Sequence, residues 1–520
     1  MFNQESRTNN VLKTSVVGTT CNLINIVLGF VYRTIFIHVL SSNYLGINGL
    51  FSNILQILSF ADLGIGTAIS YRFYEPISRN DVQKVGQLMN FFKKVYLGIA
   101  LVILIAGLGL LPFLNFFIKD INEIPSGINL QVIYILFLAQ TLSSYLFVYK
   151  QMLLSADQKQ YISSFIHTVF MLGRYILQVL ILLTTHKYIW TLASSIFLNL
   201  FLNFIFSEWV SYKYKEVFSV KGNISNEEKK RIFDDTKATL CHKIGGTVLS
   251  STDNVILSRY VGIIATGMYS NYSMILSSLS SMLNQVFGSF TSSLGNAHVT
   301  QNEEQKYVSY RRLLFGNLWI SGMCTICLYN LLNDFIVIWI GPAMLLNDFT
   351  VIVLSIQFFV ETARIISMSY TNGCGLFVRD KIRPIIEAVI NLIISIAMTK
   401  LFGIAGVFIG TIVSHLCTVF WREPYLLYKY EFKKNMQEYW VYYMWTASVT
   451  FFLCVFFSQL CIRFIPEIHS FGMWILKAIS IFIAGNSICA ICLHRNQDFE
   501  FYRKLLKKKL NHEEYKNDRN

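Results

Sequence analysis

Apolar blocks of roughly 20 residues recur along nearly the whole chain, separated by short polar segments. A helix needs about 20 residues to cross the hydrocarbon core of a bilayer, so each block has the length of one membrane span. With 54% hydrophobic and 14% charged residues, the 520-residue chain holds more apolar surface than one soluble core needs. Because a helix satisfies its own backbone hydrogen bonds in lipid, the blocks predict an all-α polytopic membrane protein.

Charged breaks between the blocks predict about 14 transmembrane helices, as two groups of six followed by two more. The expected spans are 14–39, 45–70, 92–117, 129–152, 161–184, 188–211, 239–260, 264–293, 312–340, 348–372, 384–401, 404–424, 440–463 and 469–493. The expected domains are an N-lobe at 1–212, a basic cytoplasmic linker at 213–238, a C-lobe at 239–425, two C-terminal helices at 426–494 and a charged cytoplasmic tail at 495–520. We expect the tail to have no fold of its own.

The net charge of +14 raises the question of nucleic-acid binding, but the basic residues lie in short loops and form no continuous basic face. Membrane topology accounts for them better, because Lys and Arg concentrate on the cytoplasmic side of membrane proteins. With both termini in the cytoplasm, roughly 35 of the 44 basic residues fall in inside segments and about 5 fall outside. The pattern predicts an even number of spans, cytoplasmic termini and no nucleic-acid partner.

A weak internal repeat favours two equivalent lobes. The segment 46–55 reads GINGLFSNIL and aligns with 267–276, GMYSNYSMIL, at a shift of 221 residues. The shift places each segment at the start of the second helix of its lobe. Because six spans are an even number, the lobes would share one orientation and be related by an axis along the membrane normal. A substrate-binding site is then expected between them.

Local motifs carry a resemblance to a known family. In the first lobe they are Leu45-Gly46, Phe60 to Ala68 and Tyr71 to Tyr74, and in the second Thr252-Asp253-Asn254 with Gly262 and Gly267. These resemble the motifs of Wzx-type polysaccharide repeat-unit flippases, in the superfamily of the multidrug and toxin extrusion (MATE) transporters. The resemblance implies two pseudo-symmetric six-helix lobes around a cavity that opens alternately to either side, plus two C-terminal helices. It also implies a substrate in which an oligosaccharide is joined through phosphate or pyrophosphate to an isoprenoid lipid.

Four basic residues at membrane depth are the candidate substrate-binding residues: Arg33, Arg174, Arg364 and Lys477. Such charges cost about 2.5–3.5 kcal/mol each at the centre of a span, and a guanidinium donates two hydrogen bonds at once to a phosphate. We expect the three arginines to point into one cavity between the lobes. The alternatives are an ion pair within the bundle for Arg174, snorkelling for Arg33, and an internal pair with Glu361 for Arg364. For Lys477 we expect a lipid-phosphate contact at the outer interface.

Four titratable residues are candidates for ion coupling or charge pairing: Asp62, Asp253, Glu361 and His415. A carboxylate at membrane depth can take up H+ or Na+ during a transport cycle. The alternative for Asp62 is an interfacial position or a pair with Arg72, and for His415 a neutral, hydrogen-bonded imidazole. No cofactor is expected beyond a coupling ion.

The resemblance and the deep arginines together favour a flippase that moves an isoprenoid (poly)phosphate-linked oligosaccharide to the outer leaflet of a bacterial plasma membrane. Its partners would be this substrate, membrane lipids and other polysaccharide-assembly proteins. A cation-coupled multidrug or toxin exporter is the nearest alternative, although cationic drugs favour carboxylates in a cavity. A membrane glycosyltransferase or polysaccharide polymerase would need catalytic groups in a sizeable loop, which the sequence does not offer. We therefore expect no catalytic residue, no metal and no enzyme activity.

Overall fold

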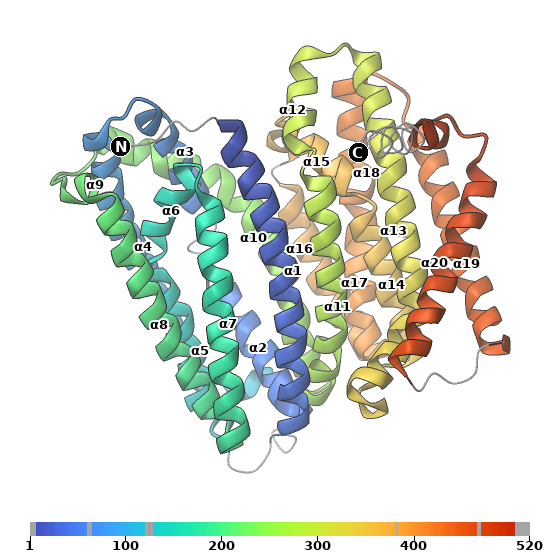
Figure 1. Cartoon of the computed structure of the whole chain (residues 1–520), viewed down its shortest axis with the longest axis horizontal. Helices are drawn as coiled ribbons and strands as arrows, with labels where there is room; N and C mark the ends of the chain where they lie inside the picture. Colours follow the sequence, from blue (N-terminus) through green and yellow to red (C-terminus); the bar gives the residue numbers. More distant parts are fainter. Residues whose placement is uncertain are drawn as a thin grey trace, which may run out of the picture. The chain divides into compact units, whose positions relative to one another are not determined.

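The computed structural model describes residues 7–59, 65–119, 124, 128–380, 382–464 and 470–504, and the regular elements in them are helices (Figure 1). The α-helices are α1 (Arg7–Val39), α2 (Ser42–Leu58), α3 (Ile65–Ser78), α4 (Val82–Leu110), α5 (Leu130–Tyr145), α6 (Val148–Ala156), α7 (Gln160–Thr185), α8 (Tyr188–Lys213), α9 (Lys215–Ser219), α10 (Asn226–Tyr260), α11 (Ile263–Gly288), α12 (Thr291–Thr300), α13 (Glu303–Ile340), α14 (Asp348–Thr362), α15 (Ile365–Gly373), α16 (Arg383–Phe402), α17 (Ile404–Cys417), α18 (Val419–Leu426), α19 (Gln437–Phe464) and α20 (Phe471–Leu493). Short 3₁₀ helices are η2 (Leu111–Phe117), η4 (Pro342–Met344) and η5 (Leu376–Asp380), and η6 (Leu427–Phe432) is a π-helical turn. The predicted all-α architecture is confirmed.

Ten of the described helices are long and apolar enough to cross a membrane, and an eleventh span results if the bent pair α5 and α6 counts as one. These coincide with eleven of the expected spans. The three others fall on α2 with α3, on the second half of α10, and on α11. Residues 60–64, between α2 and α3, lie outside the described residues. α10 begins with charged turns and α11 is rich in serine, so neither is as apolar as the other spans.

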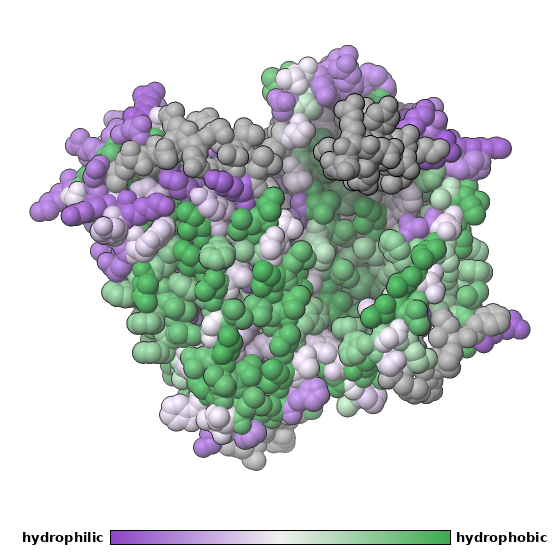
Figure 2. All heavy atoms as spheres, viewed as in Figure 1, coloured by the Kyte–Doolittle hydropathy of each residue, from purple (hydrophilic) through white to green (hydrophobic). Residues whose placement is uncertain are grey.

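Side-chain hydropathy follows the same pattern: apolar side chains cover the middle of the helices and hydrophilic side chains gather at their ends (Figure 2). Many large apolar residues are exposed, among them Val27 on α1, Ile105 on α4 and Phe197 on α8. A protein in water rarely exposes so many, whereas lipid solvates them well. The chain is a multi-pass membrane protein.

The helices form two compact units. The first contains residues 1–271 and 381–410, and the second contains 272–380 and 411–520. These units differ from the expected lobes, which divide at the linker 213–238. The difference arises because α10 packs along α2 and α16, so the seventh and eleventh predicted spans join the first unit.

Within the first unit, α2 crosses the start of α11 at the two glycines that the predicted repeat aligns, Gly46 and Gly267. A Cβ at Gly46 would lie 2.0 Å from the carbonyl oxygen of Ile263, and one at Gly267 would lie 2.3 Å from that of Ser42. Any larger residue would force the helices apart, because the atoms it would meet belong to the backbone. The aligned glycines therefore have the same structural role.

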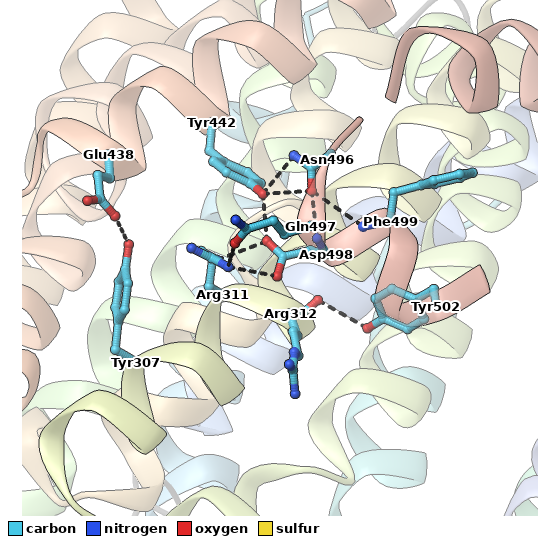
Figure 3. A network of polar contacts seen from close by, with 10 residues as sticks. All are labelled: Tyr307, Arg311, Arg312, Glu438, Tyr442, Asn496, Gln497, Asp498, Phe499 and Tyr502. Atoms are coloured by element: carbon cyan, nitrogen blue, oxygen red, sulfur yellow. Dashed lines mark hydrogen bonds and ion pairs between the residues drawn. The ribbon is translucent and has the colours of Figure 1, made fainter. Parts of the chain in front are cut away.

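In the second unit, the segment after α20 is fixed against α13 and α19 (Figure 3). The buried Asp498 carboxylate lies 2.9 Å from Nε of Arg311 and accepts a hydrogen bond of 2.6 Å from the Tyr442 hydroxyl. The Tyr502 hydroxyl donates to a carbonyl oxygen of α13 at 3.1 Å. Residues 497–504 are helical, so the expectation that the tail has no fold of its own is wrong for its described part. The reason is this buried ion pair, which the charge of the tail alone does not predict.

Candidate functional site

Helices α1 and α7 of the first unit carry two of the predicted arginines and run side by side in the same direction (Figure 1). Near the start of both helices, the Lys13 ammonium lies 6.0 Å from the centroid of the Tyr161 ring. Further along, Tyr32 and Tyr175 stack with 4.8 Å between their ring centroids. These two contacts define the register of the helices and bring the neighbouring arginines to a similar depth.

Arg33 follows Tyr32 on α1 and is held by neutral groups. Its Nε donates to Oδ1 of Asn271 at 2.9 Å, and its Nη2 donates to the hydroxyl of Ser270. The Tyr32 and Tyr188 side chains lie within electrostatic range of the guanidinium. Arg33 is therefore positioned by hydrogen bonds that leave its positive charge uncancelled.

Arg174 lies near the middle of α7, about 16 Å from the helix end, which is too deep for its side chain to reach the surface easily. Its guanidinium carbon is 5.5 Å from the centroid of the Tyr175 ring. Its Nε is buried and has no hydrogen-bond acceptor in the part of the chain that the structure describes. A buried donor without an acceptor costs about 1–3 kcal/mol, and more when it is charged. This donor is therefore available to a ligand.

We refer to Tyr32, Arg33, Arg174 and Tyr175 as the arginine–tyrosine site. Tyr32 lies within electrostatic range of both guanidinium groups, and its ring stacks on that of Tyr175, so the two arginines flank one pair of stacked rings. At low dielectric such charges attract an anion strongly, and they are costly when none is present. The planar fork of each guanidinium matches the oxygens of a phosphate. The site therefore offers the positive charge and the hydrogen-bond donors that an anion would need.

Arg364, in the second unit, is neutralised inside the protein. Its Nε and Nη2 both donate to the carboxylate of Glu423 on α18, the first at 3.2 Å. Glu423 is therefore a hydrogen-bonded partner of Arg364 that the sequence analysis did not consider. Glu361 is exposed in the last turn of α14, and a turn at 363–364 separates that helix from α15. Glu361 stays within electrostatic range of the Arg364 guanidinium across this turn, and the predicted pair between them stays a prediction.

Lys477 on α20 also has a protein partner. Its ammonium lies 2.7 Å from Oδ2 of Asp334 on α13. The Lys477 side chain is 10% exposed and that of Asp334 is 33% exposed. Asp334 therefore cancels the charge of Lys477 within the protein, and the lipid-phosphate contact of Lys477 stays a prediction.

The candidates for ion coupling lie on different helices. Asp253 is half-buried on α10 in the first unit, and His415 is buried on α17 in the second. Glu361 is exposed at the end of α14. Asp62 lies outside the described residues. Ion coupling through any of the four stays a prediction.

Sequence analysis missed both tyrosines of the site and both carboxylate partners of the second unit. Tyr32 and Tyr175 are each the sequence neighbour of a deep arginine, so an aromatic residue beside an intramembrane arginine was a usable signal. Glu423 and Asp334 were visible as lone carboxylates in apolar spans. The cation that each one meets depends on helix packing, which a single sequence does not reveal.

One cluster in the second unit has the donor atoms of a metal site. His298, Cys374 and Glu431 each offer a ligand atom, and these atoms lie within 4.8 Å of one another. The Glu431 carboxylate is already engaged, because His298 Nδ1 lies 2.7 Å from one oxygen and the Lys306 ammonium 3.1 Å from the other. The lysine supplies the positive charge that a metal ion would bring, so an ion-pair network accounts for the cluster. The expectation of no metal stays a prediction.

Known proteins match the chain by family and by fold. A family model described as polysaccharide biosynthesis protein matches residues 11–290. No curated protein matches the sequence. The lipid II flippase MurJ, in an inward closed conformation, has a TM-score of 0.65 at 13% identity, covering 92% of this chain and 100% of its own.

Two transporters extend this likeness in fold. An inward-facing multidrug resistance MATE family transporter of the MOP superfamily has a TM-score of 0.56 at 13% identity, covering 79% of this chain and 98% of its own. A MATE transporter from Vibrio cholerae has a TM-score of 0.55 at 12% identity, covering 83% and 99%. The chain therefore has the fold that these transporters share with MurJ.

Proposed function

We propose, since the chain belongs to the family of polysaccharide biosynthesis proteins, that it is a flippase for a lipid-linked oligosaccharide. The substrate would be an oligosaccharide joined through phosphate or pyrophosphate to an isoprenoid lipid. It would pass from the cytoplasmic to the outer leaflet of a bacterial plasma membrane by alternating access, with both protein termini in the cytoplasm. Other polysaccharide-assembly proteins would supply the substrate and take over the product.

The arginine–tyrosine site is the observation that carries this proposal. The buried Nε of Arg174 has no acceptor among the described residues, and Arg33 bonds to an amide and a hydroxyl. A phosphate would accept hydrogen bonds from both guanidinium groups and cancel their charge. Flipping requires a polar, anionic head to pass through the membrane while the lipid tail stays in hydrocarbon. A cationic site at membrane depth lowers that barrier, because it replaces part of the hydration that the head loses.

Coupling to H+ or Na+ is a second part of the proposal. A carboxylate at membrane depth changes its charge when it binds either ion. Asp253 is the first candidate, because it is half-buried in the same unit as the arginine–tyrosine site. Glu361, His415 and Asp62 follow.

The nearest alternative is a cation-coupled exporter of drugs or toxins, since MATE transporters share the fold. The charge of the arginine–tyrosine site disfavours this alternative, because a cationic drug would meet two uncancelled arginines. A glycosyltransferase or polymerase would need a nucleophile with its base, and the four residues of the site do not form such a pair. We therefore propose transport without an enzymatic step.

The proposal is tested by polymer assembly in cells that lack the chromosomal copy and express each variant at matched membrane abundance. Arg33→Ala and Arg174→Ala remove the donors, whereas Arg174→Lys keeps the charge and removes the planar fork. Arg79→Ala is the control, because the Arg79 side chain is 74% exposed on the surface.

We expect the two alanine variants to lose most of the polymer, the lysine variant to lose part of it, and the control to resemble the wild type. Wild-type polymer in both alanine variants would refute the anion site. Arginine-dependent export of ethidium from intact cells, with polymer unchanged, would favour the exporter instead.

A further inference from the structure

A pocket of about 400 Å³ opens between α1, α6 and α7 of the first unit, in the first third of the two spans that carry the arginine–tyrosine site. Amides and hydroxyls line much of it, including Asn22 and Asn25 on α1, Gln151 on α6, and Ser163 on α7. None of its described lining residues is Asp, Glu, Lys or Arg. Its volume lies in the ~300–1,000 Å³ range of small-molecule sites. The lining is suited to an uncharged ligand rich in hydrogen-bonding groups.

Two polar atoms of this lining are left for a ligand to satisfy. Oδ1 of Asn25 and Oγ of Ser163 are buried and have no hydrogen-bond partner among the described residues. Most buried polar atoms in proteins are paired, so two orphans in one pocket require an explanation. A bound polar molecule provides one.

Other polar side chains of the pocket are held in place by a chain of hydrogen bonds. His167 Nε2 and Gln151 Oε1 are 3.0 Å apart, as when an imidazole N–H donates to an amide oxygen. Gln151 Nε2 donates to Oδ1 of Asn203 at 3.0 Å, and Asn203 donates to Oδ1 of Asn199 at 2.8 Å. The network orients the Gln151 and His167 side chains before a ligand arrives, which lowers the entropic cost of binding.

The pocket and the arginine–tyrosine site share the same helix faces. Asn22 and Arg33 are eleven residues apart on α1, and Ser163 and Arg174 are eleven residues apart on α7. Eleven residues make about three turns, so each pair lies on one face, separated by about 16 Å along the helix. A ligand extended along α1 and α7 would therefore reach both places.

We propose that this pocket binds sugar residues of the substrate while the arginine–tyrosine site binds its phosphate. The inference rests on the proposed function and adds a site for the uncharged part of the head. Sugar hydroxyls both donate and accept hydrogen bonds, as do the amides and hydroxyls of the lining. Under the predicted topology, the pocket lies on the cytoplasmic side of the arginines. The sugars would therefore lie closer to the cytoplasm than the phosphate when both are bound.

The inference is tested by binding measurements on the full-length protein in lipid nanodiscs. The probes are the oligosaccharide released by mild acid from the lipid-linked pool of the source cells, inorganic pyrophosphate, and maltotriose as an unrelated sugar. Gly18→Leu fills the pocket, because Gly18 lines it and a Cβ there meets nothing within 4 Å. Gly98→Leu on α4 is the matched control, since a Cβ at Gly98 also meets nothing within 4 Å. Asn25→Ala and Ser163→Ala remove the two orphan acceptors.

We expect oligosaccharide affinity to fall at least about 10-fold in Gly18→Leu and about 3- to 10-fold in each alanine variant, with no change in Gly98→Leu. Pyrophosphate affinity should stay unchanged in all four variants and fall in Arg174→Ala. Wild-type oligosaccharide affinity in Gly18→Leu, or equal affinity for maltotriose, overturns the sugar subsite. Pyrophosphate binding that does not depend on Arg174 overturns the proposed function instead, so the two failures are distinguishable.

Discussion

The two units treat their deep cations in opposite ways. In the second unit, Arg364 and Lys477 each lie against a carboxylate. In the first unit, Arg33 bonds to neutral groups, and Arg174 has a buried donor without an acceptor among the described residues. The second unit cancels the charge of its two deep cations with carboxylates. The first unit keeps the positive charge of its two deep arginines, which costs free energy at membrane depth.

The difference teaches that the depth of a basic residue in the membrane does not show whether it binds a ligand or joins two helices. A deep cation with a carboxylate partner mainly joins two helices. A deep cation whose charge stays uncancelled is disfavoured until an anion arrives, so selection keeps it for a ligand. By this criterion, Arg364 and Lys477 are structural cations, and Arg33 and Arg174 are candidates for ligand binding.

Breaking the Arg364 pair has the largest expected effect. Glu423→Gln removes the carboxylate that both Nε and Nη2 of the buried guanidinium contact, so we expect the free energy of unfolding to fall by about 3–5 kcal/mol. The double variant Arg364→Met with Glu423→Leu removes both charges and should recover most of that loss. Unfolding of the purified protein in nanodiscs measures both changes. Equal stability of Glu423→Gln and the wild type would mean that this pair does not hold the second unit together.

Arg174→Met tests whether the first unit is destabilised by a deep cation whose charge is not cancelled. It removes an uncancelled cation, so we expect the free energy of unfolding to rise by about 1–3 kcal/mol. Transport should fall about 10- to 100-fold, because hydrogen bonds to a charged group are lost. Nanodisc unfolding and flipping of lipid-linked oligosaccharide in proteoliposomes measure the two quantities. A variant that loses both stability and transport would make Arg174 a structural cation, and the contrast between the units would disappear.

Variants of Tyr175, whose ring stacks on Tyr32, test whether the tyrosines belong to the site in the first unit. Tyr175→Leu removes the ring, and Tyr175→Phe keeps it and removes only the hydroxyl. Aromatic and cation–π contacts are worth about 0.5–1.5 kcal/mol, so we expect about 2- to 10-fold slower flipping for Leu and little change for Phe. The same proteoliposome assay measures both variants. Wild-type rates for the leucine variant would exclude the tyrosines from the site and leave the arginines alone in it.

Much of the fold could be predicted because lipid places the same demand on every span, about 20 apolar residues. The helix α11, which is less apolar than most other spans, was predicted from the charged breaks around it, and the repeat supported it by aligning Gly267 with Gly46. The compact units could not be predicted in the same way. They depend on how α10 packs against α2 and α16, and helix packing in lipid follows small-residue contacts that periodicity does not reveal.

The candidate site could be predicted only in part. Depth in an apolar span predicted a substrate contact for Arg33, Arg174 and Arg364 alike, and it did not distinguish the arginine that pairs with Glu423 from the other two. Glu423, whose carboxylate accepts hydrogen bonds from Arg364, is 59 residues away from that arginine in the chain. Long-range pairing of this kind depends on tertiary contacts, which local spacing does not encode.

Breaking the Lys477–Asp334 pair has the smallest expected effect on stability. It tests whether a deep cation with a carboxylate partner has no role in transport. Asp334 is 33% exposed, and the flexible lysine stem can carry the ammonium to the interface when the partner is lost. We therefore expect Asp334→Asn to lower the free energy of unfolding by about 1 kcal/mol or less and to leave flipping unchanged. Nanodisc unfolding and the proteoliposome assay measure the two quantities against the wild type. Slower flipping at unchanged stability would place Lys477 on the substrate path, because a merely structural pair acts on transport only through folding. A carboxylate partner would then no longer exclude a role in transport, and the contrast between the units would depend on Arg364 alone.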